Sequence, residues 1–153
     1  MQIVIRRPVT VVLLLVVTAL IIGLTMTMKG KSYSKVDPIP FEDLRHLVHR
    51  LEHRPVSTQI FAVTVMPVVA NVILFVPWGF LMFISLYTAD RPTLQTYVLT
   101  ILLGLTFTVT VEAVQYFLPD RVADVNDIIL NTAGTLLGAL LGHARLRLRF
   151  EFQ

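Results

Sequence analysis

The stretch that decides the fold is PVTVVLLLVVTALIIGLTMTM, residues 8–28, an apolar run of 21 residues without a charged side chain. At about 1.5 Å per residue, a helix of this length crosses the roughly 30 Å hydrocarbon core of a bilayer. The run is longer than the apolar part of a signal peptide and is followed by Lys29-Gly30-Lys31 instead of a small-residue cleavage site. We therefore expect a retained membrane helix.

Three further apolar stretches follow, at about residues 62–87, 94–117 and 125–142. Hydrophobic residues make up 55% of the chain and charged residues only 15%, which is too few charges for the surface of a soluble domain. The sequence predicts an all-α fold, in which residues 1–153 form a single integral membrane domain, a four-helix bundle.

The basic residues flank the predicted spans. Arg6 and Arg7 precede the first span, and Arg145, Arg147 and Arg149 follow the last. Bases in such positions anchor helices to anionic headgroups, so the net charge of +3 does not indicate a nucleic-acid partner. Because no acidic residues accompany these bases, we expect both termini on the cytoplasmic side. With no cysteine, the chain cannot form a disulfide or use a thiolate.

The connector between the first two spans contains an amphipathic helix, predicted at about residues 41–54. Its apolar side chains recur at helical spacing and form one stripe, made of Phe41, Leu44, Leu47, Val48 and Leu51. Glu42 and Asp43 stand in the first turn, and His53 and Arg54 stand in the last, as the helix dipole favours. We expect this helix to lie on the membrane surface.

Three histidines of the connector helix share a face. His46, His49 and His53 are spaced at i, i+3 and i+7, which would allow a zinc or pH-sensing site. The simpler interpretation is that they form the hydrated side of an amphipathic helix. We favour the simpler interpretation, because the sequence alone places no carboxylate or further ligand beside them.

The junction of the third and fourth spans is rich in polar side chains. Glu112 and Gln115 lie one helical turn apart near the end of the third span. Asp124, Asp127 and Asn131 follow at i, i+3 and i+7 near the beginning of the fourth. Because only a short turn separates the two helices, both polar faces should lie on the same side of the membrane.

Ionised side chains are costly in a bilayer, by about 2.5–3.5 kcal/mol at a helix centre, and usually face a partner or a wet cavity. Arg121 lies in the turn and can reach either polar face. The excess of acid could be offset by protonation, by a divalent cation on Glu112, Asp124 and Asp127, or by the cationic part of a ligand. The order of the spans places Asn71 in the same half of the bilayer.

Glycines in the fourth span mark a close helix contact. Gly134, Gly138 and Gly142 form two overlapping GxxxG patterns on one helical face, where two backbones can approach. The face could mediate a homodimer or pack inside the bundle of one chain. We favour packing inside the bundle.

Three linked motifs occur in order between about residues 70 and 142: Asn71-x3-Phe75-x-Pro77-x-Gly79-Phe80, Glu112-x2-Gln115, and Arg121-x2-Asp124-x2-Asp127-x3-Asn131-x2-Gly134-x3-Gly138. Together they resemble the VanZ-like family of small bacterial membrane proteins. The resemblance implies a four-helix protein of the bacterial cytoplasmic membrane, associated with resistance to glycopeptide antibiotics, particularly the lipid-bearing teicoplanin. It implies no mechanism.

Our leading hypothesis is a binding protein whose polar side chains hold a lipid-like ligand at the outer membrane face. The ligand would be a membrane lipid, a lipid-tailed glycopeptide or a cell-wall lipid precursor. The proposed site consists of Asn71, Glu112, Gln115, Arg121, Asp124, Asp127 and Asn131.

Two alternatives remain. The first is an intramembrane enzyme acting on a lipid-linked phosphate or acyl group, with Glu112 or Asp127 as acid or base and Arg121 on the phosphate. The lack of a recognisable nucleophile weighs against it. The second is a membrane scaffold that packs through the glycine face.

Overall fold

The computed structural model describes residues 7–27, 36–37, 39–53, 57–88, 90–119 and 122–151. Within these ranges the chain forms five helices and two very short strands. In order they are α1 (Arg7–Thr27), β1 (Val36–Asp37), α2 (Glu42–His53), α3 (Thr58–Leu86), α4 (Thr93–Phe117), β2 (Ala123–Asp124) and α5 (Val125–Glu151). The predicted all-α fold is confirmed.

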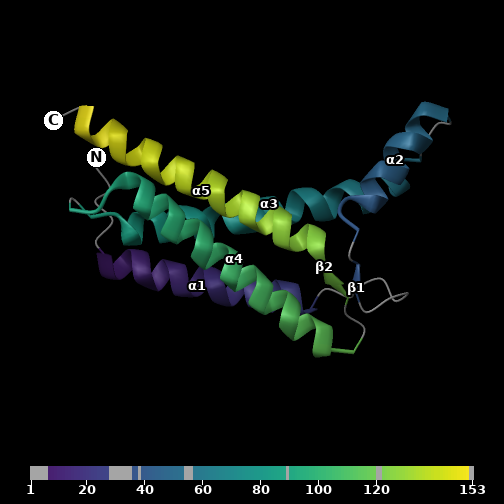
Figure 1. Ribbon diagram of the computed structural model, residues 1–153, viewed down its shortest axis with the longest axis horizontal. Helices are drawn as coiled ribbons and strands as arrows, with labels where there is room; N and C mark the ends of the chain where they lie inside the picture. The colour runs from purple at the N-terminus through teal and green to yellow at the C-terminus, as the bar shows by residue number, and fades with distance from the viewer. Residues whose placement is uncertain are drawn as a thin grey trace.

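Four of the helices, α1, α3, α4 and α5, are long and apolar enough to cross a membrane. They run alongside one another in alternating directions (Figure 1). The start of α1 and the end of α5 lie at one end of the bundle, and β1 and β2 lie at the other. We call the latter the β end.

Two helices extend beyond the apolar stretches expected from the sequence. The apolar part of α5 reaches Leu146, and the helix itself continues to Glu151. The turns after Gly142 continue the helix because they contain Ala, Leu and Arg, which are good helix formers. The other long helix, α3, begins at Thr58, where the hydroxyl of Ser57 accepts a hydrogen bond from the Ile60 amide. Its 29 residues span about 43 Å, which exceeds the thickness of the hydrocarbon core.

The connector helix α2 has the amphipathic pattern expected of it. Leu47 is buried, and α2 contacts α3, whereas Val48 and Leu51 are exposed. Figure 1 shows α2 beyond the β end of the bundle, next to the start of α3. Its placement on the membrane surface stays a prediction.

The backbones of α3 and α5 touch through glycines. A methyl group added at Gly134 would collide with the carbonyl oxygen of Val72, and one added at Gly138 would collide with that of Val76. From the other side, a methyl group at Gly79 would collide with the backbone of Thr135. The glycine face of α5 is therefore occupied within the chain, by α3.

The remaining helices pack around this pair. Gly104 of α4 lies against Thr135, where an added methyl group would come within 2.6 Å of the threonine side chain. Phe107 stacks on Trp78, with ring centroids 5.5 Å apart. Trp78 also donates from Nε1 to Thr18 Oγ1 of α1, 3.1 Å away. This bond, together with the packing of Ile21 against Phe75 and Trp78, orients α1 against α3.

The connector is held to the turn between α4 and α5. β1 pairs with β2 in parallel, with Val36 opposite Ala123 and Asp37 opposite Asp124. Just beyond, the Phe41 amide donates to Asn126 Oδ1 at 2.6 Å. Phe41 has a φ of 58°, a left-handed conformation that costs a non-glycine residue about 1–2 kcal/mol. The hydrogen bond from the Phe41 amide to Asn126 offsets part of this cost and orders the start of α2.

Replacing Gly138 by leucine should destabilise the bundle by about 3 kcal/mol or more, because the new side chain must separate two backbones in contact. The measurement is the midpoint of thermal unfolding in detergent. Gly23→Leu is the control, since a methyl group at Gly23 meets nothing within 4 Å. Equal midpoints for the two variants would contradict the proposed packing.

Replacing Asn126 by alanine should loosen the connector, because the amide of Phe41 loses its acceptor. Loss of one such bond costs about 1–3 kcal/mol, so amide exchange at Ile39 and Phe41 should accelerate about tenfold. Hydrogen–deuterium exchange measures this directly. Gln95→Ala, which removes an exposed amide near the other end of α4, should leave these residues unchanged.

Candidate functional site

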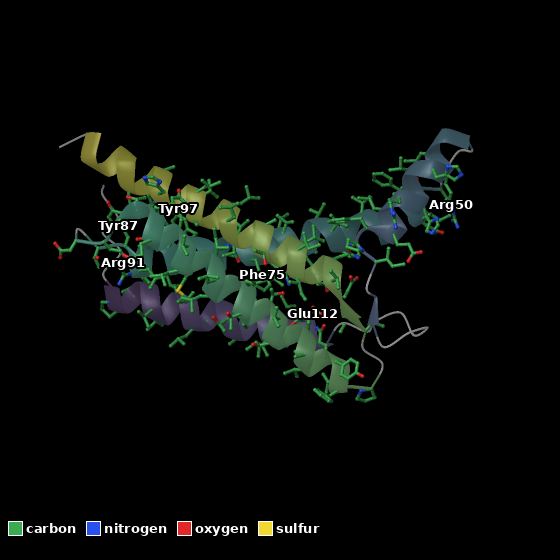
Figure 2. The ribbon with its side chains drawn as sticks, in the orientation of Figure 1. Arg50, Phe75, Tyr87, Arg91, Tyr97 and Glu112 are labelled. Carbon is green, nitrogen blue, oxygen red and sulfur yellow. The ribbon has the colours of Figure 1, made fainter. Side chains whose placement is uncertain are left out.

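The face of α4 that points into the bundle carries a buried polar stripe. Most of its members follow one another at intervals of four residues: Thr96, Thr100, Gly104, Thr108 and Glu112. Gln115 continues the buried face by one more turn. Figure 2 shows Glu112 toward the β end of this helix. The stripe therefore runs from the first turn of α4 to the junction with α5.

Glu112 binds the beginning of α5. Its side chain is only 5% exposed, and Oε2 accepts a hydrogen bond from the Asp124 amide at 2.9 Å. Asp124 precedes the first residue of α5 and caps it, since its Oδ1 accepts from the Asn126 amide at 2.7 Å. The amides at a helix N-terminus carry partial positive charge, which stabilises both carboxylates.

Asp127 and Asn71 form a second pair. Asn71 Nδ2 donates to Asp127 Oδ1, and both side chains are half-buried. Asp127 lies in the first turn of α5, where the helix dipole again favours an acid. The bond joins α3 to α5 at the β end, in the same half of the bundle as Glu112.

Asn131 forms a third pair, one turn deeper. It is 3% exposed, and its Nδ2 donates to Thr108 Oγ1 at 2.9 Å. In the part of the chain that the structure describes, no donor reaches its Oδ1. A buried acceptor without a donor costs about 1–3 kcal/mol, so this oxygen is expected to bind something.

Gln115 is buried with the others but has a different partner. Its Nε2 donates to the Thr25 carbonyl oxygen of α1 at 3.1 Å. It therefore joins α4 to α1 and lies at the side of the cluster. Arg121 falls outside the described residues.

Sequence reasoning missed Thr108 and the carbonyl of Thr25. Thr108 precedes Glu112 by four residues, so helical spacing could have identified it as part of the same face. Nothing in the sequence identifies a backbone carbonyl as a partner.

The side chains considered as metal ligands do not form a metal site among the described residues. Among the described residues, no three histidine, aspartate or glutamate side chains are arranged to hold a metal ion. On α2, His46 Nε2 lies 3.7 Å from Glu42 Oε1, with both side chains exposed, and His49 is exposed as well. The side chain of His53 lies outside the described part of the chain.

The three pairs place acceptor oxygens in successive turns of two helices. We use the name polar cluster for Asn71, Thr108, Glu112, Asp124, Asp127 and Asn131. Carboxylate and amide oxygens outnumber donors in this set, and carboxylates retain several acceptor positions even when bonded. Chemically, the polar cluster is suited to binding a group that donates hydrogen bonds, above all a cationic one.

Comparison with known protein families matches residues 9–146 to VanZ/LLP1. No curated protein and no solved structure matches the chain. The family match extends beyond the motifs recognised in residues 70–142, since it includes nearly all of α1, the connector and the polar cluster. Together with the four candidate spans, it identifies a multi-pass membrane protein. The chain belongs to the VanZ/LLP1 family.

Proposed function

We propose that this protein binds a lipid-tailed molecule in the bacterial cytoplasmic membrane. The polar head of the ligand lies at the polar cluster, and its tail lies beside the helices in the bilayer. The observation that carries the proposal is Glu112, an acid that is 5% exposed within a helix long and apolar enough to span the membrane.

The Glu112 carboxylate brings a charge that its hydrogen bond with the Asp124 amide does not by itself require. The carbonyl of a glutamine could accept the same hydrogen bond from the Asp124 amide, and it would bring no charge into the bundle. A charge near the bilayer costs up to about 2.5–3.5 kcal/mol, and such residues commonly mark functional sites. A ligand that donates hydrogen bonds to Glu112 gives the charge a role.

The surroundings suit a ligand with an apolar tail. Val114 and Phe117 lie near the end of α4, on either side of Gln115 in the sequence, and Phe117 is 80% exposed. Lipid-facing side chains of this kind offer a surface for an acyl chain at the depth where the head meets the polar cluster. No charged side chain stands between Glu112 and Phe117 on this helix.

We place the β end outside the cell and both termini in the cytoplasm. The start of α1 and the end of α5 lie at the opposite end of the bundle from the polar cluster (Figure 1). The basic residues at the end of α5 support a cytoplasmic location for that end. In this orientation the site meets molecules arriving at the outer face, and we propose that it contributes to resistance against lipoglycopeptides such as teicoplanin.

Glu112→Gln should weaken binding of fluorescently labelled teicoplanin to the protein in nanodiscs by about tenfold or more, as expected for a lost charged hydrogen bond. Resistance of a susceptible host that expresses the variant should fall in parallel, at unchanged abundance in the membrane. Glu42→Gln makes the same chemical change on the exposed surface of α2 and should alter neither quantity. Unchanged binding and resistance for Glu112→Gln would refute the proposal.

A further inference from the structure

We infer that the head of the ligand carries a primary ammonium group, which donates a hydrogen bond to Asn131 Oδ1. The inference rests on the binding function proposed above and specifies the chemistry of the ligand. Its starting point is the one buried side-chain acceptor that lacks a donor among the described residues.

The position of Asn131 determines which protein groups surround the ammonium group of the ligand. Asp127 precedes it by one turn of α5, and its own amide group reaches across to Thr108 of α4. Glu112 follows Thr108 by one turn of α4. The Asn131 side chain therefore meets α4 one helical turn from Glu112, and on its own helix it lies one turn from Asp127.

The two carboxylates favour a cation over a neutral donor. Glu112 accepts from the Asp124 amide and Asp127 from the Asn71 amide, and an ionised carboxylate can accept from several donors at once. A primary ammonium has three N–H donors, no acceptor and a positive charge. It can donate one hydrogen bond to Asn131 Oδ1, and its charge is attracted by the carboxylates of Glu112 and Asp127. A water molecule has two donors and no charge, and a quaternary ammonium has no N–H at all.

Burial of the polar cluster increases from the β end inward. Asn71 and Asp127 are half-buried and lie nearer the β end than Asn131, which is almost completely buried. A head that enters at the β end thus passes Asp127 before it reaches the unpaired oxygen. Its tail stays in the bilayer.

Phosphatidylethanolamine and phosphatidylcholine of identical acyl composition provide a matched pair of probes. The first has a primary ammonium with three N–H donors, and the second has a trimethylammonium with none. The protein is released from nanodiscs that contain equal amounts of both lipids. Native mass spectrometry then measures how much of each lipid stays bound. We expect wild-type protein to retain phosphatidylethanolamine about tenfold in excess.

Two variants at position 131 test the role of the oxygen. Asn131→Leu, of similar volume, should reduce the ratio to about one, as expected for the loss of a bond to a charged group. Asn131→Asp retains an acceptor and should keep or raise the ratio, so it decides the question if the leucine variant does not fold. Thr110→Val is the control, because Thr110 is exposed and its hydroxyl donates to Thr106 of its own helix.

The outcomes separate the inference from the proposed function. Equal retention of the two lipids by wild-type protein would overturn the ammonium inference, while binding that depends on Glu112 would still stand. A preference that persists in Asn131→Leu, or that is lost in Asn131→Asp, would also overturn the inference. If wild-type protein retains neither lipid above the level retained by Glu112→Gln, the ammonium inference and the proposed function are both contradicted. Displacement of phosphatidylethanolamine by added teicoplanin would assign the ammonium to the antibiotic, and retention would assign it to the lipid.

Discussion

The contact between the backbones of α3 and α5 is the constraint on which the rest of the structure depends. With glycine at Gly134 and Gly138, the carbonyls of Val72 and Val76 approach α5 so closely that no side chain fits between them. This contact fixes the rotation and depth of α5 against α3, and so brings Asp127 within hydrogen-bonding reach of Asn71. It also fixes the start of α5, where Asp124 meets Glu112. A packing requirement thus determines the geometry of the polar cluster.

The same arrangement explains how acids are tolerated inside an apolar bundle. Glu112, Asp124 and Asp127 all lie around the N-terminus of α5, where backbone amides lack partners within the helix. These amides and the helix dipole supply positive potential at the acids. The acids in turn accept hydrogen bonds from backbone amides that would otherwise be unpaired in a membrane, at a cost in free energy. The proposed binding would therefore use groups that also stabilise the start of α5, and a ligand that competes for the acids would have to replace the hydrogen bonds of these amides.

The four membrane helices could be predicted because apolar runs of this length have one stable conformation in a bilayer. The connector helix could be predicted because its apolar residues recur at helical spacing. The order of the spans also predicted that Asn71 would lie in the same half of the bilayer as Asp127. The partners of Gln115 and Asn131 could not be predicted, because they depend on the rotation of each helix, and the glycine contacts that set this rotation are visible only in three dimensions. Gln115 shares a face with Glu112 as expected, yet that face borders α1 as well as α5, and its amide reaches Thr25. Helical periodicity gives the face of a helix but not the neighbour that covers it.

The short parallel pairing of β1 with β2 links two parts of the molecule that differ in their surroundings. Asp37, which follows α1 and leads toward α2, lies opposite Asp124 in this pairing. The amide of Asp124 is in turn bonded to the buried acid Glu112. The pairing therefore connects the segment that precedes α2 to the buried end of α4. A displacement of the connector would shift the start of α5, where the Asp124 amide is bonded to Glu112.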